Sequence, residues 1–250
     1  MANFTTMSGF LLMGFSGKPE IEMLFAALFL VLVALVGNIL IITTTSMDHS
    51  LSSPMYFFLK HLSFLDLCYI SVMVPRSICN SFMHNGYISL WECILQCFAF
   101  TLCGCAEIAL LTVMSYDRYV AICLPLCYEV IMDISTCVHG VLAVWTSGIL
   151  GGVMHTAATF SIHFYGANII HQFFCDVPQL LKLSCSNEYV GELGVSGFFS
   201  LVAFVCFISI GVTYMHIFST VLRIPSAEGR ARAFSTIFLP YLLIIVLTGI

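Results

Sequence analysis

The chain has 250 residues, of which 60% are hydrophobic and only 8% are charged, whereas about a quarter of the residues of an average soluble domain are charged. This composition indicates a membrane protein. The formal net charge is −5, and no basic block could follow a phosphate backbone, which argues against a nucleic-acid partner. The sequence also contains no Gly-rich phosphate loop, metal-ligand cluster or nucleophile with a nearby base, so we expect neither an enzyme nor a cofactor.

Long apolar runs predict membrane-spanning helices, because lipid cannot satisfy free backbone groups and a helix needs about 20 apolar residues to cross the bilayer. A β-barrel would show short alternating segments instead. We therefore expect an all-α membrane protein with one transmembrane domain over residues 1–250. The predicted spans lie at about 21–45, 56–80, 92–122, 138–158, 191–218 and 232–250. The first span is expected to act as the insertion signal, since the start of the chain has no basic region.

Three signals predict the orientation of these spans. Asn3 begins the only acceptable glycosylation acceptor, which would lie outside the cell. Three arginines between the fifth and sixth spans favour a cytoplasmic loop, namely Arg223, Arg230 and Arg232. Five crossings before that loop place the N-terminus outside the cell, in a multi-pass protein of the plasma membrane.

The third span contains paired charges near one end and an acid near its middle. Cys93 precedes Arg118 by 25 residues, which is about 37 Å of helix and nearly seven full turns, so both lie on one face at opposite membrane edges. Asp117 and Arg118 would thus lie at the cytoplasmic interface, where water limits the cost of their charges. Glu107 is expected deep in the bundle beside Asp66 of the second span, with a shared proton or cation.

Several motifs now carry a family resemblance. They are "GN" at 37–38, "SPMYFFLKHLSFLDLC" at 53–68, "MSYDRYVAIC" at 114–123, "HQFFCD" at 171–176 and "RAFST" at 232–236. In this order over nearly the whole chain, they resemble the olfactory receptors, a branch of the rhodopsin-like G-protein-coupled receptors. The resemblance implies a rhodopsin-like helical bundle of seven helices, of which about six are present here, with an odorant pocket among the helices. It also implies signalling through the stimulatory olfactory G protein.

The resemblance assigns roles to individual residues. Asp117, Arg118 and Tyr119 would form the switch that engages the G protein, and Tyr214 of the fifth span would swing toward Arg118 on activation. Cys93 would form a disulfide with Cys175, since both cysteines lie at an oxidising extracellular edge. The intramembrane polar residues are Asn38, Asp66 and Glu107.

The candidate ligand-binding residues lie on the third and fifth spans, about 18–27 Å of helix from the switch residues of the same spans. They are Phe100, Thr101, Gly104, Cys105, Phe198, Phe199 and Val202. Such a lining is almost wholly apolar, which suits a small volatile odorant held by shape and dispersion. Three histidines, His155, His163 and His171, are eight residues apart, and we interpret them as ordinary loop or helix residues because this spacing does not place metal ligands on one helical turn.

The chain also departs from the family pattern. No seventh-helix signature follows the sixth run, the first cytoplasmic loop has no Lys or Arg, and Cys127 occupies a position that usually holds Arg. In the long extracellular loop, Tyr165 stands where a cysteine is expected, which leaves Cys185 without its partner. An alternative interpretation is therefore a receptor remnant that inserts but does not signal. A further alternative is an ion- or proton-coupled transporter that uses Asp66 and Glu107 as a relay, although no inverted repeat supports it.

Overall fold

Long helices dominate the computed structural model, which describes residues 9–12, 18–47, 53–83, 87–162, 169–170, 175 and 190–223. The long helices are α1 (Lys18–Met47), α2 (Pro54–Met83), α3 (Leu90–Cys123), α5 (Ile134–Phe160) and α7 (Val190–Leu222). Among the described residues, five helices are long and apolar enough to cross a membrane. The helical bundle predicted from the apolar runs is confirmed. Several predictions fall outside the described residues, namely those on Asn3, His163, Tyr165, His171, Cys185, Arg230, Arg232 and the run at 232–250.

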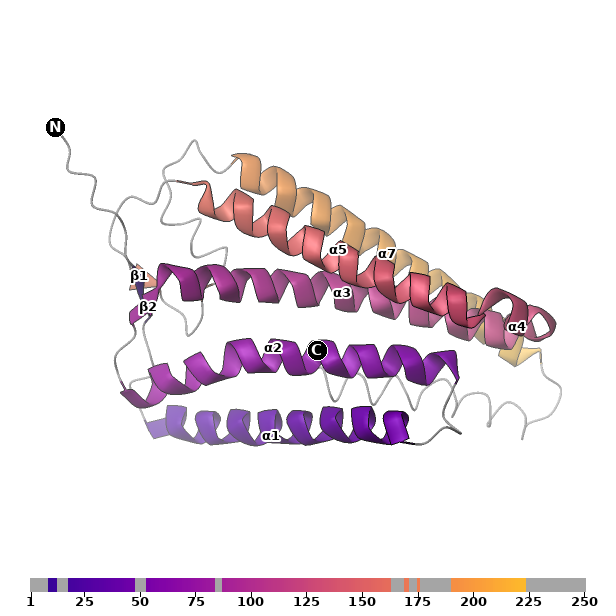
Figure 1. Cartoon of the computed structure of the whole chain (residues 1–250), viewed down its shortest axis with the longest axis horizontal. Helices are drawn as coiled ribbons and strands as arrows, with labels where there is room; N and C mark the ends of the chain where they lie inside the picture. Colours follow the sequence, from indigo (N-terminus) through magenta and orange to yellow (C-terminus); the bar gives the residue numbers. More distant parts are fainter. Residues whose placement is uncertain are drawn as a thin grey trace.

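The helices pack in layers around α3 (Figure 1). In this view α1 lies on α2, α2 lies on α3, and α5 and α7 lie together on the other side of α3. The core between these layers consists of apolar side chains of α2, α3 and α5, including Phe58, Leu62, Leu110, Val141 and Val144. α3 therefore contacts most of the bundle and can connect its two ends.

Capping side chains define where α3 and α5 begin. Ser89 and Glu92 form a capping box, in which the Ser89 amide donates to Glu92 Oε2 at 2.9 Å and the Glu92 amide donates to Ser89 Oγ at 3.3 Å. At the start of α5, the Thr136 amide donates to Asp133 Oδ1 at 2.9 Å. Hydrogen bonds with Thr136 lower the pKa of the exposed Asp133 carboxyl, so this cap is ionised at neutral pH.

α5 approaches α3 closely because two of its glycines face that helix. A Cβ atom at Gly148 would lie 2.8 Å from the carbonyl oxygen of Leu102, and a Cβ at Gly152 would lie 2.9 Å from the ring of Phe98. Small residues four positions apart let two helix backbones pack together inside a membrane. The Gly148–Gly152 pair therefore fixes the distance between α3 and α5.

A small sheet at one end of the bundle differs from the all-α expectation. β1 (Gly9–Leu12) pairs antiparallel with β2 (Tyr87–Ser89) and parallel with β3 (Ile169–Ile170). These strands are too short to produce a readable alternation, and their partners are distant in the sequence. We call this end the sheet end, and the opposite end, which holds Asp117–Tyr119, the switch end.

The connection between α3 and α5 lies at the switch end. It consists of a 3₁₀ turn over Pro125–Cys127 and the short helix α4 (Tyr128–Ile131). Leu126 in this turn is 99% exposed. The switch end therefore presents an apolar side chain beside the predicted switch residues.

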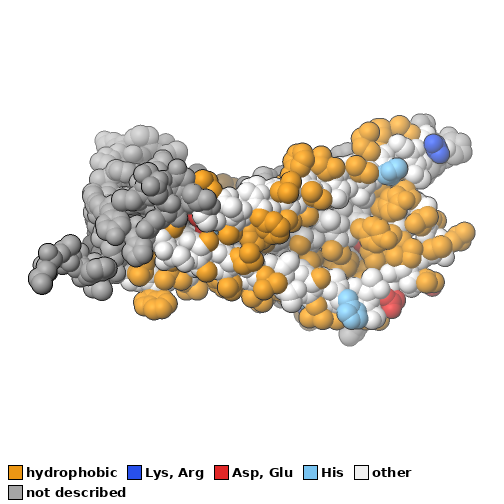
Figure 2. All heavy atoms as spheres, turned by 90° about the horizontal axis from the view of Figure 1, so that it is seen from above, with side chains coloured by type: hydrophobic (Ala, Val, Ile, Leu, Met, Phe, Trp, Pro, Cys, Tyr) orange, Lys and Arg blue, Asp and Glu red, His pale blue; other side chains and the backbone are white. Residues whose placement is uncertain are grey.

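The outer surface of the bundle is apolar. Hydrophobic side chains extend along the described part of the face seen in Figure 2, whereas the few Lys, Arg and His side chains visible there gather toward one end. On α7 the exposed apolar side chains include Leu201, Phe204, Phe207 and Ile208. Such a surface is stable against lipid and not against water, which agrees with the predicted spans.

Candidate ligand and switch sites

A disulfide attaches Cys175 to the sheet end of α3. Cys93 and Cys175 are bonded, with their Cα atoms 5.4 Å apart, which is the pairing that the family resemblance implies. The Cys175 amide also donates to Gln96 Oε1 at 3.2 Å. Both cysteines and Gln96 are buried, so this attachment is shielded from solvent.

Two of the predicted ligand-binding residues meet at a glycine of α5, toward the sheet end of the bundle. A Cβ atom at Gly151 would lie 3.1 Å from Cys105 Sγ and 3.2 Å from the ring of Phe199. The Phe199 ring also lies near the ring of His155, with 5.8 Å between centroids. Helices α3, α5 and α7 thus bring Cys105, Gly151, His155 and Phe199 into one group, which we call the outer cluster.

The other predicted ligand-binding residues are less closely joined to the outer cluster. The ring centroids of Phe198 and Phe199 are 5.4 Å apart, but Phe198 is 56% exposed and Val202 is 42% exposed. Phe100 lies against Tyr69 of α2, with ring centroids 6.1 Å apart.

Two of the predicted ligand-binding residues of α3, Thr101 and Gly104, extend no polar group away from their own helix. Thr101 donates its hydroxyl to the Cys97 carbonyl at 3.0 Å, so its polar group is turned back onto its own helix. A Cβ at Gly104 would meet no heavy atom within 4 Å. The space beside Gly104 is therefore open.

A buried acid adds a polar group that the sequence analysis did not include. Glu192 of α7 is 1% exposed, and its Oε1 atom lies 2.8 Å from Nδ1 of His155. Ser196, one turn further along α7, donates to the same carboxylate oxygen at 3.3 Å. In the part of the chain that the structure describes, Glu192 Oε2 and the hydroxyl of Thr156 are buried without a hydrogen-bond partner.

This arrangement gives the outer cluster a hydrogen-bond acceptor. An unpartnered buried carboxylate oxygen costs free energy until a donor reaches it. The sequence signal was the pair Glu192 and Ser196, four residues apart on one helix face. It was missed because Glu192 lies near the end of a span, where an acid is usually solvated.

The middle of the bundle contains the predicted acid pair. Asp66 of α2 is buried and lies close enough to interact with Glu107 of α3 and Asn38 of α1. Asn38 is fully buried, and its amide group lies beside the Asp66 carboxyl. Two facing carboxylates repel each other in a low dielectric unless they share a proton or a cation.

At the switch end, Asp117 is held by α4 and not by its neighbour in the sequence. The Tyr128 hydroxyl donates to Asp117 Oδ1 at 2.9 Å, and Asp117 is only 2% exposed. Burial, followed by the negative charge of Asp117, raises the pKa of Tyr128, so the phenol remains a donor. This partner was missed because Tyr128 lies outside the predicted spans.

The other switch residues point to different helices. The Arg118 side chain contacts Met55 Sδ at the start of α2. The Tyr119 ring lies 6.2 Å from the ring of His216 on α7, and Tyr119 and Tyr214 both pack against the buried pair Ile217 and Val221. The predicted switch residues of α3 therefore contact α2, α4 and α7 together.

Comparisons with known proteins identify relatives over nearly the whole chain. The model of the family described as 7 transmembrane receptor (rhodopsin family) matches residues 37–249. Olfactory receptor 14J1 of Homo sapiens is 60% identical over 246 residues, which are 98% of this chain and 76% of that protein. Olfactory receptor 14A16 of Homo sapiens is 52% identical over 248 residues, which are 98% of this chain and 80% of that protein.

Proposed function

The chain belongs to the rhodopsin family of seven-transmembrane receptors, and on this premise we propose that it is an odorant receptor of the plasma membrane. It binds a small volatile ligand and activates a heterotrimeric stimulatory olfactory G protein. The observation that carries this proposal is the 60% identity to a protein named as an olfactory receptor. Members of the family are multi-pass membrane receptors and not enzymes, and family membership also disfavours the transporter interpretation.

The ligand site of this proposal is the outer cluster. Cys105 and Phe199 provide apolar contacts from α3 and α7, and both pack closely around Gly151, where an added Cβ would lie 3.1 and 3.2 Å from them. Within the part of the chain that the structure describes, Glu192 Oε2 is an unpartnered acceptor next to this group. A ligand with an apolar body and one hydrogen-bond donor, such as an alcohol, would satisfy both features.

The coupling site of this proposal is the switch end. The Tyr128–Asp117 hydrogen bond holds one switch residue, and the Met55 contact holds Arg118. Release of these contacts would free both charged groups for the G protein. Leu126 is 99% exposed at the same end and offers an apolar contact to that partner.

The proposed orientation places the sheet end outside the cell and the switch end in the cytoplasm. The Cys93–Cys175 disulfide lies at the sheet end, and disulfides persist in oxidising compartments. Arg118 and Arg223 lie toward the other end, as the preference of basic residues for the cytoplasm requires. An epitope tag before Met1 should be accessible on intact cells, and Asn3→Gln should remove a glycan from the protein on a gel.

The signalling test uses the 250-residue chain in cells that contain the stimulatory olfactory G protein and a cyclic AMP reporter. Surface expression is measured by the N-terminal tag. A panel of volatile alcohols and their methyl ethers is applied, because the ether lacks the donor. We expect a dose-dependent response to at least one alcohol, loss of that response in Arg118→Ala, and a weaker response in Glu192→Gln.

Matched controls separate function from folding. Glu92→Gln makes the same chemical change at an exposed acid of the sheet end and retains the capping box, so it should respond like the parent chain. A chain that reaches the surface but shows neither a ligand response nor a basal signal above Arg118→Ala would instead support the non-signalling remnant.

A further inference from the structure

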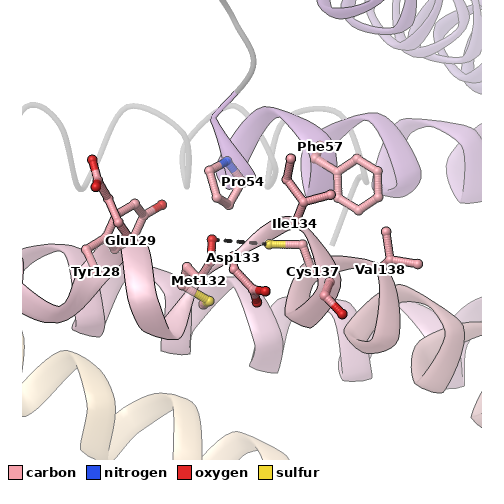
Figure 3. Close-up of a pocket in the computed structure, with 10 residues that line it drawn as sticks. Pro54, Phe57, Tyr128, Glu129, Met132, Asp133, Ile134, Cys137 and Val138 are labelled. Carbon is pink, nitrogen blue, oxygen red and sulfur yellow. Dashed lines mark hydrogen bonds between the residues drawn. The ribbon is translucent and has the colours of Figure 1, made fainter.

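A cavity at the switch end lies apart from the outer cluster. It has a volume of about 490 Å³, within the range of about 300–1,000 Å³ that is typical of small-molecule sites. Figure 3 shows Pro54 and Phe57 of α2 on one side of this cavity and the segment from Tyr128 to Val138 on the other. We call it the α2–α4 cavity.

Most of the wall of the α2–α4 cavity is apolar. Phe57, Met132, Ile134 and Val138 line it, and Met132 is buried, whereas Ile134 is 86% exposed. The Cys137 thiol lies 3.9 Å from the Met132 carbonyl and is turned into the wall (Figure 3). An apolar group of a ligand in the cavity would therefore bury the exposed apolar surface of Ile134 and its neighbours, which is favourable.

The polar part of the wall carries negative charge. Glu129 and Asp133 both line the cavity and are exposed, and none of its ten lining residues is Lys or Arg. Asp133 is ionised at neutral pH because hydrogen bonds with Thr136 lower its pKa. His139 also lowers the pKa of Asp133 electrostatically, and its ring contacts the Ser135 carbonyl at 2.7 Å.

We propose that the α2–α4 cavity binds hydrophobic organic amines, with the ammonium group beside Glu129 and Asp133. The apolar wall selects an aromatic or alkyl body, and the two carboxylates select a positive charge over a neutral or negative one. An anionic lipid headgroup is disfavoured by the same charges. Tyr128 also lines the cavity, so a bound amine touches the residue that donates to Asp117.

The experiment uses the purified 250-residue chain in nanodiscs of phosphatidylcholine, which has no net charge. The probe is a phenylalkylamine with a photoactivatable diazirine, and its matched control is the phenylalkyl alcohol of the same length. After irradiation, labelled peptides are mapped by mass spectrometry. We expect saturable labelling by the amine within residues 54–57 and 128–138, with half-saturation at about fivefold lower concentration than for the alcohol, because an exposed ion pair supports a difference of that order.

Two variants test the charge requirement and the cavity itself. Glu129→Gln combined with Asp133→Asn keeps the side-chain sizes and the α5 cap, since Asn is also a good N-cap. This variant should bring the amine to the half-saturation of the alcohol and leave the alcohol unchanged. Val138→Trp fills the cavity and should reduce labelling by both probes, whereas Glu92→Gln should change neither.

The result that overturns the proposal is defined for the parent chain and for the variants. Equal half-saturation of amine and alcohol in the parent chain would remove the charge requirement, whatever the variants do. Labelling that does not saturate, or that persists unchanged in Val138→Trp, would show that the probes partition into lipid. Because binding is measured on the purified chain without a G protein, the outcome is independent of the proposed signalling function.

Discussion

Replacing Gly148 by Ala should separate α3 from α5 and destabilise the bundle. The added Cβ would lie 2.8 Å from the Leu102 carbonyl oxygen and 3.0 Å from the Ala106 Cβ. Neither neighbour is the end of a flexible side chain, because one is backbone and the other is attached directly to it. The two helices must therefore move apart by several tenths of an ångström.

The expected magnitude follows from two opposing effects. Overpacking a tight contact costs about 1–3 kcal/mol, while Gly to Ala in a helix interior contributes up to about 1 kcal/mol in the other direction. The net loss in the free energy of unfolding is about 1–2 kcal/mol, or roughly 2–8 °C in melting temperature for a chain of this length. Gly140→Ala is the matched control on the same helix, since its Cβ would meet only Val113 Cγ1, at 3.7 Å, and it should be neutral or slightly stabilising.

The chain contains its own reporter for this measurement. Cys103 and Cys137 are free and buried, so a dye that fluoresces on reaction with thiols follows their exposure during heating. Both glycine variants keep every cysteine and can be compared directly in the same detergent. If Gly148→Ala melted at the same temperature as Gly140→Ala, the close contact between α3 and α5 would not limit stability and the reasoning would fail.

Three further predictions concern polar contacts. His155→Ala removes the side chain that lies 2.8 Å from the buried Glu192 carboxyl and should cost about 2 kcal/mol in the same thermal assay, because a buried polar group then loses a partner. Most of this loss should disappear when Glu192→Gln is added, and an unchanged loss would contradict the pairing. Tyr128→Phe removes the donor to Asp117, should cost about 1 kcal/mol, and should raise ligand-independent cyclic AMP; a basal signal equal to that of the parent would argue against a restraining role. The pKa of Asp133 is lowered in the fold, so its cap on α5 is fully present above the ordinary carboxyl pKa and is lost only as the pH falls through the lowered value. Circular dichroism of the parent chain should therefore show constant helicity from about pH 7 to 5. At neutral pH, Asp133→Ala should lose helicity, whereas Asp133→Asn should keep it.

The helical part of the fold was predictable because the apolar runs that indicate it are long. Each span rests on about twenty apolar residues, and lipid leaves helix as the simplest way to satisfy their backbones. The helix α3 at Leu90–Cys123 contains the expected range 92–122, and the added residues at its start come from the capping box at Ser89. The three strands were not predictable, since four, three and two residues give no periodicity.

Some contacts of the candidate sites could be predicted from the sequence, and others could not. Proximity of Asp66 and Glu107 could be expected, because an ionisable side chain inside the membrane is costly in free energy and is usually paired with another polar group. The contact between Tyr128 and Asp117 could not, because it depends on how the chain turns after α3. Nor could helix periodicity reveal that Glu192 faces His155, since that depends on the rotation of α7 against α5.

The strand order β2-β1-β3 constrains how the chain crosses the bilayer. Two long helices separate β1 from β2, and two more separate β2 from β3, so the strands lie on the same side of the membrane when each of these helices makes one complete crossing. A helix that failed to insert would leave a strand on the wrong side of the membrane, where no hydrogen bond could reach it. β1 lies within the first twelve residues but pairs with β3 at residues 169–170. The three-stranded sheet can therefore be completed only after α5 has crossed the membrane. In the proposed orientation, the sheet therefore forms on the extracellular side, after four long helices have been inserted.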